Sequence, residues 1–122
     1  MTPEAFHNAA LALAGATFDV KWGADRIYSV AGKMFAAAGR VGEDRPRYMF
    51  KTSPMAFELL IEAGLAHPAP YLARASWVRL ESADALEDEA LSAYLAQAHA
   101  LVVQGLPKAA RTKLQSGAAP LT

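Results

Sequence analysis

The sequence predicts a single α+β domain in which helices pack against an antiparallel β-sheet. The chain has 122 residues, of which 53% are hydrophobic and 20% charged, and this is enough apolar sequence for one core. Several short strand-like runs follow one another closely between residues 16 and 51, a spacing typical of antiparallel neighbours. Longer segments on either side carry helical periodicity and helix-ending residues. We expect one domain over residues 1–115 and a flexible tail over residues 116–122.

The first helix and the first strand follow directly from the N-terminal residues. Thr2 and the proline after it are typical of a helix start, and Gly15 is typical of a helix end. In the run that follows, Phe18, Val20 and Trp22 alternate with polar residues. We therefore expect a strand with one buried face and one exposed face.

More strands are predicted in the next thirty residues of the chain. Residues 26–32 form one strand-like run, and Gly32-Lys33 separates it from the apolar run 34–38. Residues 39–46 are polar and contain glycine and proline, which indicates a loop. The run 47–51 is the next strand, with alternating polar and apolar side chains.

The middle of the chain combines a helix, a turn and a strand. Residues 53–64 predict a helix, because a serine cap and a proline open the segment and a glycine closes it. The proline-rich segment 65–73 is expected to be irregular. Residues 76–80 predict a strand that places Trp77 and Arg79 on one face.

The C-terminal part is predicted to be helical. An acidic segment, residues 81–89, suits a helix start because the helix dipole favours negative charge there. The expected buried seam of this helix consists of Leu91, Leu95, Ala98 and Val102. Gly105 ends the helix, and a short basic helix follows over residues 107–114.

Charge is balanced in total but uneven along the chain. Twelve basic and twelve acidic residues give a net charge of zero, which weakens a nucleic-acid interpretation. Residues 20–51, however, hold seven basic and three acidic side chains, whereas residues 81–89 hold five acidic ones and no basic one. A polarised surface is compatible with this pattern, as is a set of ordinary solvated charges.

No catalytic or metal-binding motif is present. The sequence has no G-x-S-x-G motif and no glycine-rich phosphate loop, and its three histidines, His7, His67 and His99, are far apart. It also has no cysteine, so neither a disulfide nor a thiolate site is expected. We expect a non-catalytic protein without a metal or other cofactor. No signal-like or membrane-length segment is visible, so we expect a cytoplasmic protein.

The candidate binding residues form a basic and aromatic set. They are Lys33, Arg47, Lys51, Arg74, Trp77 and Arg79. Such residues on one sheet face can contact phosphates and stack on a base or sugar. For Trp77 the alternative is a place in the core, and for Lys51 it is a local role beside the predicted helix cap.

Three segments together resemble the MmcQ/YjbR family of small bacterial proteins. They are Ala31-Gly32-Lys33-Met34-Phe35-Ala36, Lys51-Thr52-Ser53-Pro54 and the stretch from Pro70 to Val78 that contains Arg74 and Trp77. The order and spacing of these pieces carry the resemblance, which covers residues 22–114. Ala73, Ser76 and His99 depart from residues that the family often has at these places. The resemblance implies a compact, CyaY-like α+β fold and a DNA-binding protein.

The sequence favours a non-catalytic domain that binds DNA or another nucleic acid weakly and without sequence preference. Zero net charge favours the alternative of a protein-interaction or regulatory module that binds no nucleic acid. A pocket for a small ligand beside Tyr71 and Trp77 is a third interpretation. We expect a monomer or a weak dimer with no membrane partner.

Overall fold

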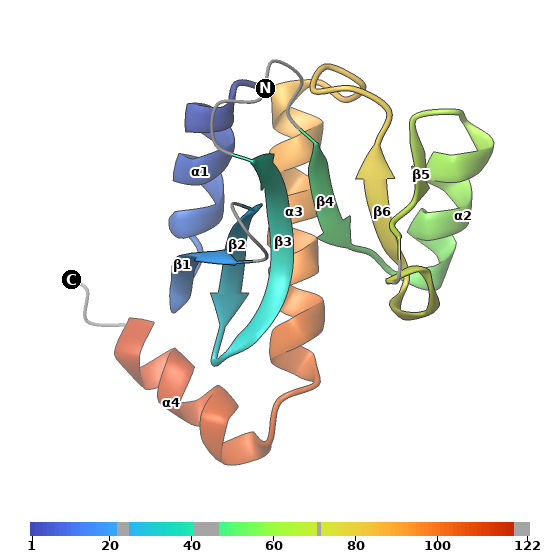
Figure 1. The fold of residues 1–122 in the computed structure, drawn as a ribbon. Coiled ribbons are helices and arrows are strands. Elements are labelled where there is room, and N and C mark those ends of the chain that lie inside the picture. The colour runs from blue at the N-terminus through green and yellow to red at the C-terminus, as the bar shows by residue number, and fades with distance from the viewer. Residues whose placement is uncertain (22–24, 41–46, 71, 119–122) are drawn as a thin grey trace.

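The protein is a single α+β domain, as predicted, built on a six-stranded antiparallel sheet with the strand order β1-β2-β3-β4-β6-β5 (Figure 1). The computed structural model describes residues 1–21, 25–40, 47–70 and 72–118. The strands are β1 (Ala16–Lys21), β2 (Asp25–Val30), β3 (Lys33–Arg40), β4 (Tyr48–Lys51), β5 (Ala66–Pro68) and β6 (Trp77–Leu80). The helices are α1 (Pro3–Leu11), α2 (Pro54–Glu62), the short 3-10 helix η1 (Ala73–Ala75), α3 (Asp88–Gln104) and α4 (Lys108–Ala118).

The two predicted helix starts are confirmed in their atomic detail. The Thr2 hydroxyl accepts a hydrogen bond from the backbone N–H of Ala5 at 3.1 Å, and the Ser53 hydroxyl accepts one from the N–H of Ala56 at 3.1 Å. A proline follows each cap in the first turn, where its missing N–H leaves no hydrogen bond unmade. These two local sequences therefore fix where α1 and α2 begin.

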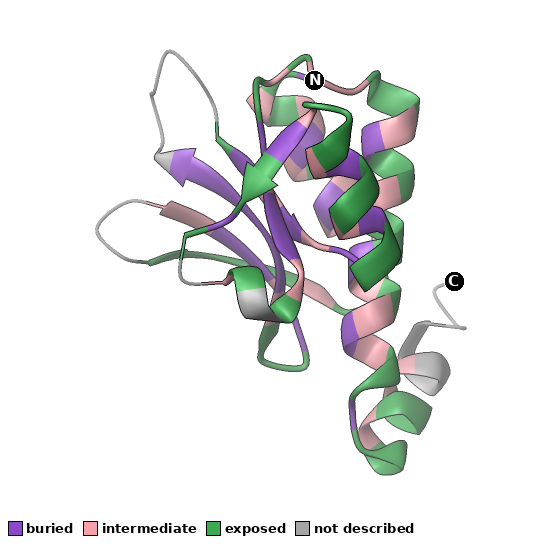
Figure 2. Ribbon diagram, turned by 90° about the vertical axis from the view of Figure 1, so that its right-hand side faces the viewer, coloured by how far each residue is buried: buried purple, intermediate pink, exposed green. Residues whose placement is uncertain are grey.

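The core lies between the sheet and the helices (Figure 2). The four residues predicted as the α3 seam are all buried: Leu91, Leu95, Ala98 and Val102. They face β3 and β4, against which α3 packs. On the α1 side, Phe6 stacks on Tyr48 with ring centroids 4.3 Å apart. The helix-covered face of the sheet is thus filled by apolar and aromatic side chains.

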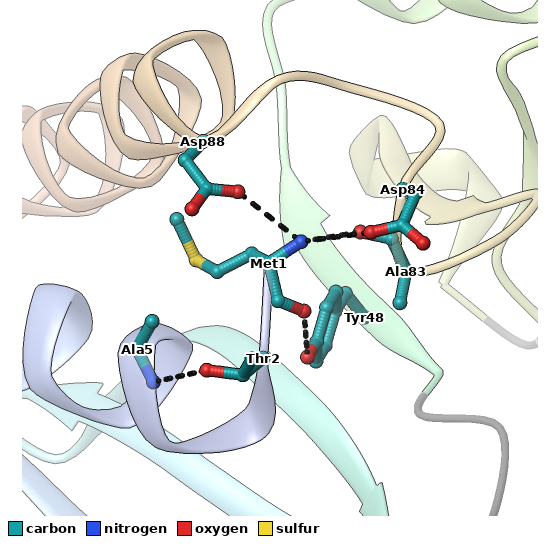
Figure 3. A network of polar contacts seen from close by, with 7 residues as sticks. All are labelled: Met1, Thr2, Ala5, Tyr48, Ala83, Asp84 and Asp88. Atoms are coloured by element: carbon teal, nitrogen blue, oxygen red, sulfur yellow. Dashed lines mark hydrogen bonds and ion pairs between the residues drawn. The ribbon is translucent and has the colours of Figure 1, made fainter.

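The N-terminal residue is held between β4 and the start of α3 (Figure 3). The Met1 amino group donates to the Ala83 carbonyl at 2.9 Å and pairs with the carboxylates of Asp84 and Asp88 at 3.3 and 3.2 Å. The Tyr48 hydroxyl donates to the Met1 carbonyl at 2.7 Å. Part of the acidic segment that was expected to favour the start of α3 therefore also binds the Met1 amino group.

Two expectations about the strands were wrong. The segment expected to be irregular contains β5, a three-residue edge strand with Pro68, which pairs with β6; proline is tolerated at a sheet edge, so the sequence signal was weak. The apolar face of β1 is not buried, because Phe18 and Val20 are 40% and 46% exposed. Here β1 is itself an edge strand, and Trp22 lies outside the described residues.

The last helix is longer than the sequence suggested. It continues to Ala118, beyond the expected end at residue 114. Leu114 packs against the turn at Gly15, which connects α4 to the start of β1. In the described ranges, no helix combines the length and the apolar character that crossing a membrane requires.

Candidate nucleic-acid interface

The two faces of the sheet differ in what covers them. Helices α1, α2 and α3 lie on one side of the sheet, and in the described part of the chain only the short η1 accompanies the strands on the other side (Figure 2). Side chains alternate between the faces of a strand, so the neighbours of buried Tyr48, Phe50 and Val78 point away from the helices. We call this second side the open sheet face.

Strand register assembles a continuous row of residues across the open sheet face. Ile27 lies opposite Ala37, Ala37 opposite Met49, Met49 opposite Arg79, and Arg79 opposite His67. Directly opposed residues in antiparallel strands share a face. The row therefore runs from β2 to β5 with Met49 near its centre.

A pocket of about 440 Å³ opens on this row. Its described lining consists of Asp25, Gly39, Arg47, Met49, Pro70, Leu72 and Arg79. Three of these residues are apolar and three are charged, an arrangement typical of sites that hold a small organic group and orient it by a few polar contacts. Its volume lies within the roughly 300–1,000 Å³ of small-molecule sites.

Two guanidinium groups flank this pocket. Arg79 is partly buried and has no hydrogen-bond or ion-pair partner among the residues that the structure describes. Arg47 is exposed, and its carbonyl accepts the Gly39 N–H at 2.9 Å, which ties the start of β4 to β3. Asp25 is the one acid in the described lining. The lining thus combines two cations with one carboxylate, a set that can take an anion and also accept a hydrogen bond.

Lys51 lies on the same face but has a local partner. It sits opposite Trp77 in the register of β4 and β6, about 7 Å along the strand from Met49. Its ammonium group donates to the Ala75 carbonyl at 2.9 Å, so it fastens η1 to β4. Lys51 thus has a local structural role, which was the alternative to phosphate binding. Its partner is in η1, however, and not at the predicted helix cap.

Trp77 does not provide the exposed stacking platform that the sequence suggested. Only 4% of its surface is exposed, and stacking on a base needs an accessible ring face. The backbone carbonyl of Trp77 accepts a hydrogen bond from the Ala69 N–H at 3.0 Å, and the backbone N–H of Trp77 donates to the Leu72 carbonyl at 3.3 Å. These bonds hold Ala69 and Leu72 beside Trp77, and Pro70 and Leu72 contribute the apolar lining in place of the Trp77 ring.

The two remaining predicted residues are not part of the described pocket. Lys33 is exposed at the start of β3, and Gly39 lies six positions further along the chain, or roughly 20 Å of extended strand. Arg74 belongs to η1, but its side chain lies outside the part of the chain that the structure describes. Of the six predicted residues, Arg47 and Arg79 are the ones that meet at the pocket.

Asp25, Gly39, Pro70 and Leu72 line the pocket but were not predicted as site residues. Asp25 reaches the pocket only because β2 pairs with β3. The proline-aromatic turn at residues 70–71 was the available signal, because it suggested a small-ligand pocket. Tyr71 itself lies outside the described residues.

Comparison with known proteins bears on the family and the fold. The sequence model of the YjbR family matches residues 11–101, which is most of the chain. The crystal structure of Deinococcus radiodurans protein DR2400, with the family-model domain DUF419, is similar with a TM-score of 0.83 and 21% sequence identity, covering 93% of this chain and 88% of that chain. No curated protein matches this chain. The structural likeness establishes a shared fold, and the sequence match establishes that the chain belongs to the YjbR family.

Proposed function

We propose that this protein is a non-catalytic binding protein that holds a nucleotide unit of a single-stranded nucleic acid, such as DNA, in the pocket of the open sheet face. Arg47 and Arg79 contact the phosphate, and the base lies against Met49 and Leu72. Asp25 accepts a hydrogen bond from a sugar hydroxyl or a base amino group. The observation that carries this proposal is the meeting of two arginines over one apolar pocket.

The chemistry of the lining supports an anionic, partly apolar ligand. A guanidinium group binds phosphate oxygens through two parallel N–H donors, and Arg79 has this capacity unused among the described residues. Phosphate alone would not need the apolar surface of Met49, Pro70 and Leu72. A nucleotide supplies both parts, because its base is a flat group with hydrogen-bonding edges.

The concave shape favours a single strand over a duplex. A base must leave its stack and its partner to enter a pocket, and unpaired strands offer such bases at low cost. The described lining also contains no serine, histidine or cysteine, which supports binding without catalysis. Zero net charge fits a weak interaction with few phosphate contacts.

Fluorescence anisotropy with labelled single-stranded and duplex DNA tests the proposal. We expect tighter binding of the single strand, with affinity falling as salt is raised from about 50 to about 200 mM. Arg79→Ala should weaken binding at both salt concentrations and lower the salt dependence by about 0.7, the contribution of one phosphate contact on a single strand. The matched control is Arg111→Ala, because Arg111 is exposed on α4 and does not line the pocket.

Three results would contradict the proposal. The first is an absence of binding at low salt and high protein concentration. The second is an equal loss in Arg79→Ala and Arg111→Ala, since that indicates diffuse attraction to the whole surface. The third is a mononucleotide that binds as tightly as the oligonucleotide, because the pocket would then be a small-ligand site.

A protein-interaction module is the second candidate. On α2, Met55 and Leu59 are 74% and 58% exposed, and their i, i+4 spacing places them on one side of the helix. Exposed apolar pairs of this kind favour protein contacts. If this is the function, a pull-down partner should be lost with Leu59→Ser, retained with Arg79→Ala, and displaced poorly by polynucleotide.

A further inference from the structure

The two edges of the sheet are protected to different degrees. At one edge, β5 has three residues, includes Pro68 and packs beside α2. Short strands and prolines are devices that prevent edge-to-edge pairing. At the other edge, β1 has six residues and no proline, and its pairing partner in the described chain is β2 alone. This edge is therefore the one suited to receive a further strand.

The backbone of β1 presents hydrogen-bonding groups outward. Val20 lies opposite Arg26 of β2. Its backbone N–H nevertheless points away from β2, because it donates to the Asp19 carboxylate at 2.8 Å. Backbone groups alternate in direction along an antiparallel strand. Phe18 therefore also directs its N–H and carbonyl groups toward the free edge.

The side chains of β1 are apolar on one face and charged on the other. Phe18 and Val20 are 40% and 46% exposed on the helix-covered side, where Phe18 contacts the rings of His7 and Tyr28. Asp19 and Lys21 are exposed on the other side. Phe18 and Val20 are thus exposed beside a free strand edge, next to one acid and one base.

We infer that β1 is a docking edge for a second copy of this chain, which pairs antiparallel with Val20 opposite Val20 at the two-fold axis. In this register Asp19 lies opposite Lys21 of the second copy, and Lys21 lies opposite Asp19 of the second copy. Because the backbone N–H and carbonyl groups of Val20 point outward, the two Val20 residues form the hydrogen-bonded type of opposed pair at the axis. A register centred on Asp19 would instead oppose two carboxylates, which is unfavourable.

The dimer is weak because its formation competes with a bond already present. The Asp19 carboxylate must release the Val20 N–H before the carbonyl of the second copy can accept a hydrogen bond from that N–H. Charged residues on an edge strand limit such pairing in many proteins. The interface also consists of one short strand from each copy, so association depends on protein concentration.

Cysteine cross-linking tests the proposed register, since the chain has no native cysteine. We expect Val20→Cys to form a disulfide-linked dimer under mild oxidation, because hydrogen-bonded opposed residues have Cα atoms about 5.5 Å apart, within disulfide range. The matched control is Met55→Cys, an exposed residue on α2, which should remain monomeric at the same concentration. Equal cross-linking of the two variants would overturn the inference.

Charge reversal gives an independent test by analytical ultracentrifugation. Asp19→Lys should decrease the dimer fraction, because it opposes two lysines across the axis. The Asp19→Lys/Lys21→Asp double variant should restore the dimer, because it recreates the opposite charges in exchanged positions. The inference fails if the unmodified protein remains monomeric at high concentration, or if Asp19→Lys raises the dimer fraction, as simple release of the Val20 N–H would.

Discussion

Tyr48 is the residue that connects the N-terminal segment most directly to the sheet. It is fully buried, its ring stacks on Phe6, and its hydroxyl donates to the Met1 carbonyl at 2.7 Å (Figure 3). The ion pairs of the Met1 amino group lie beside it, but their carboxylates are 93% and 70% exposed. Exposed pairs contribute little to stability, so we assign more of the stabilisation to the buried hydrogen bond and ring contact.

Tyr48→Phe should destabilise the protein by about 1 to 2 kcal/mol, because the ring contact is kept while the buried Met1 carbonyl loses its donor. Urea denaturation measures this change. Tyr94→Phe is the matched control, since Tyr94 stacks on Phe50 and its hydroxyl has no partner among the described residues. Equal effects of the two substitutions would show that the hydrogen bond to Met1 does not stabilise the fold.

Alkaline pH should also reveal the environment of Tyr48. Burial raises its pKa from 10.0 to about 12, and Arg26 opposes part of this rise. The Tyr48 hydroxyl ionises near pH 10 in the unfolded chain but keeps its proton there in the folded chain. The free energy of unfolding therefore keeps its full Tyr48 contribution below pH 10. It then falls by roughly 2 to 3 kcal/mol as the pH approaches 12. The urea midpoint should change less between about pH 9 and about pH 11 in Tyr48→Phe than in the unmodified protein. An equal change in the two proteins would contradict this assignment.

At the scale of elements, the contact between Leu114 and Gly15 joins α4 to the rest of the domain. A Cβ atom placed on Gly15 would lie 2.4 Å from the Leu114 side chain, and Gly15 has a φ of +69°. Gly64 has a similar φ of +76°, and a Cβ atom added there would have no neighbouring atom within 4 Å. The two glycines share the backbone requirement and differ in the contact with α4.

Gly64→Ala should cost about 1 kcal/mol from the left-handed backbone alone. Gly15→Ala should cost more, because the new methyl group must also displace Leu114 from its position. Thermal or urea denaturation gives both values, and amide exchange in α4 should increase only in Gly15→Ala. Equal costs would mean that the contact between Leu114 and Gly15 does not hold α4.

At the scale of the whole molecule, the sheet separates two kinds of surface. Its helix-covered face is apolar and, apart from β1, buried, whereas its open face carries Arg47, Arg79, the pocket and the row centred on Met49. The net charge of the chain is zero, but its charges are separated in space. Part of the acidic segment lies beside the Met1 amino group and not at the pocket. A weak, local interaction with an anion is therefore compatible with a neutral protein.

Local signals in the sequence predicted much of this fold. The caps at Thr2 and Ser53 and the α3 seam were predicted correctly, because each depends on neighbours within a few turns. The pocket was not predicted as a whole, because Asp25, Met49 and Arg79 meet only through the register of separate strands. The burial of Trp77 likewise depends on tertiary packing, since alternation places it on the open sheet face without indicating what lies over it.

Chemical-shift mapping of the ¹⁵N-labelled protein with a single-stranded oligonucleotide tests whether the pocket of the open sheet face holds a nucleotide. We expect the largest shifts at the amides of Gly39, Met49, Leu72 and Arg79, which line one pocket, and little change at Met55 on α2. These shifts should disappear in Arg79→Ala while the rest of the spectrum stays folded. Shifts confined to α2 or α4, or none at low salt, would contradict a nucleotide site on the open sheet face.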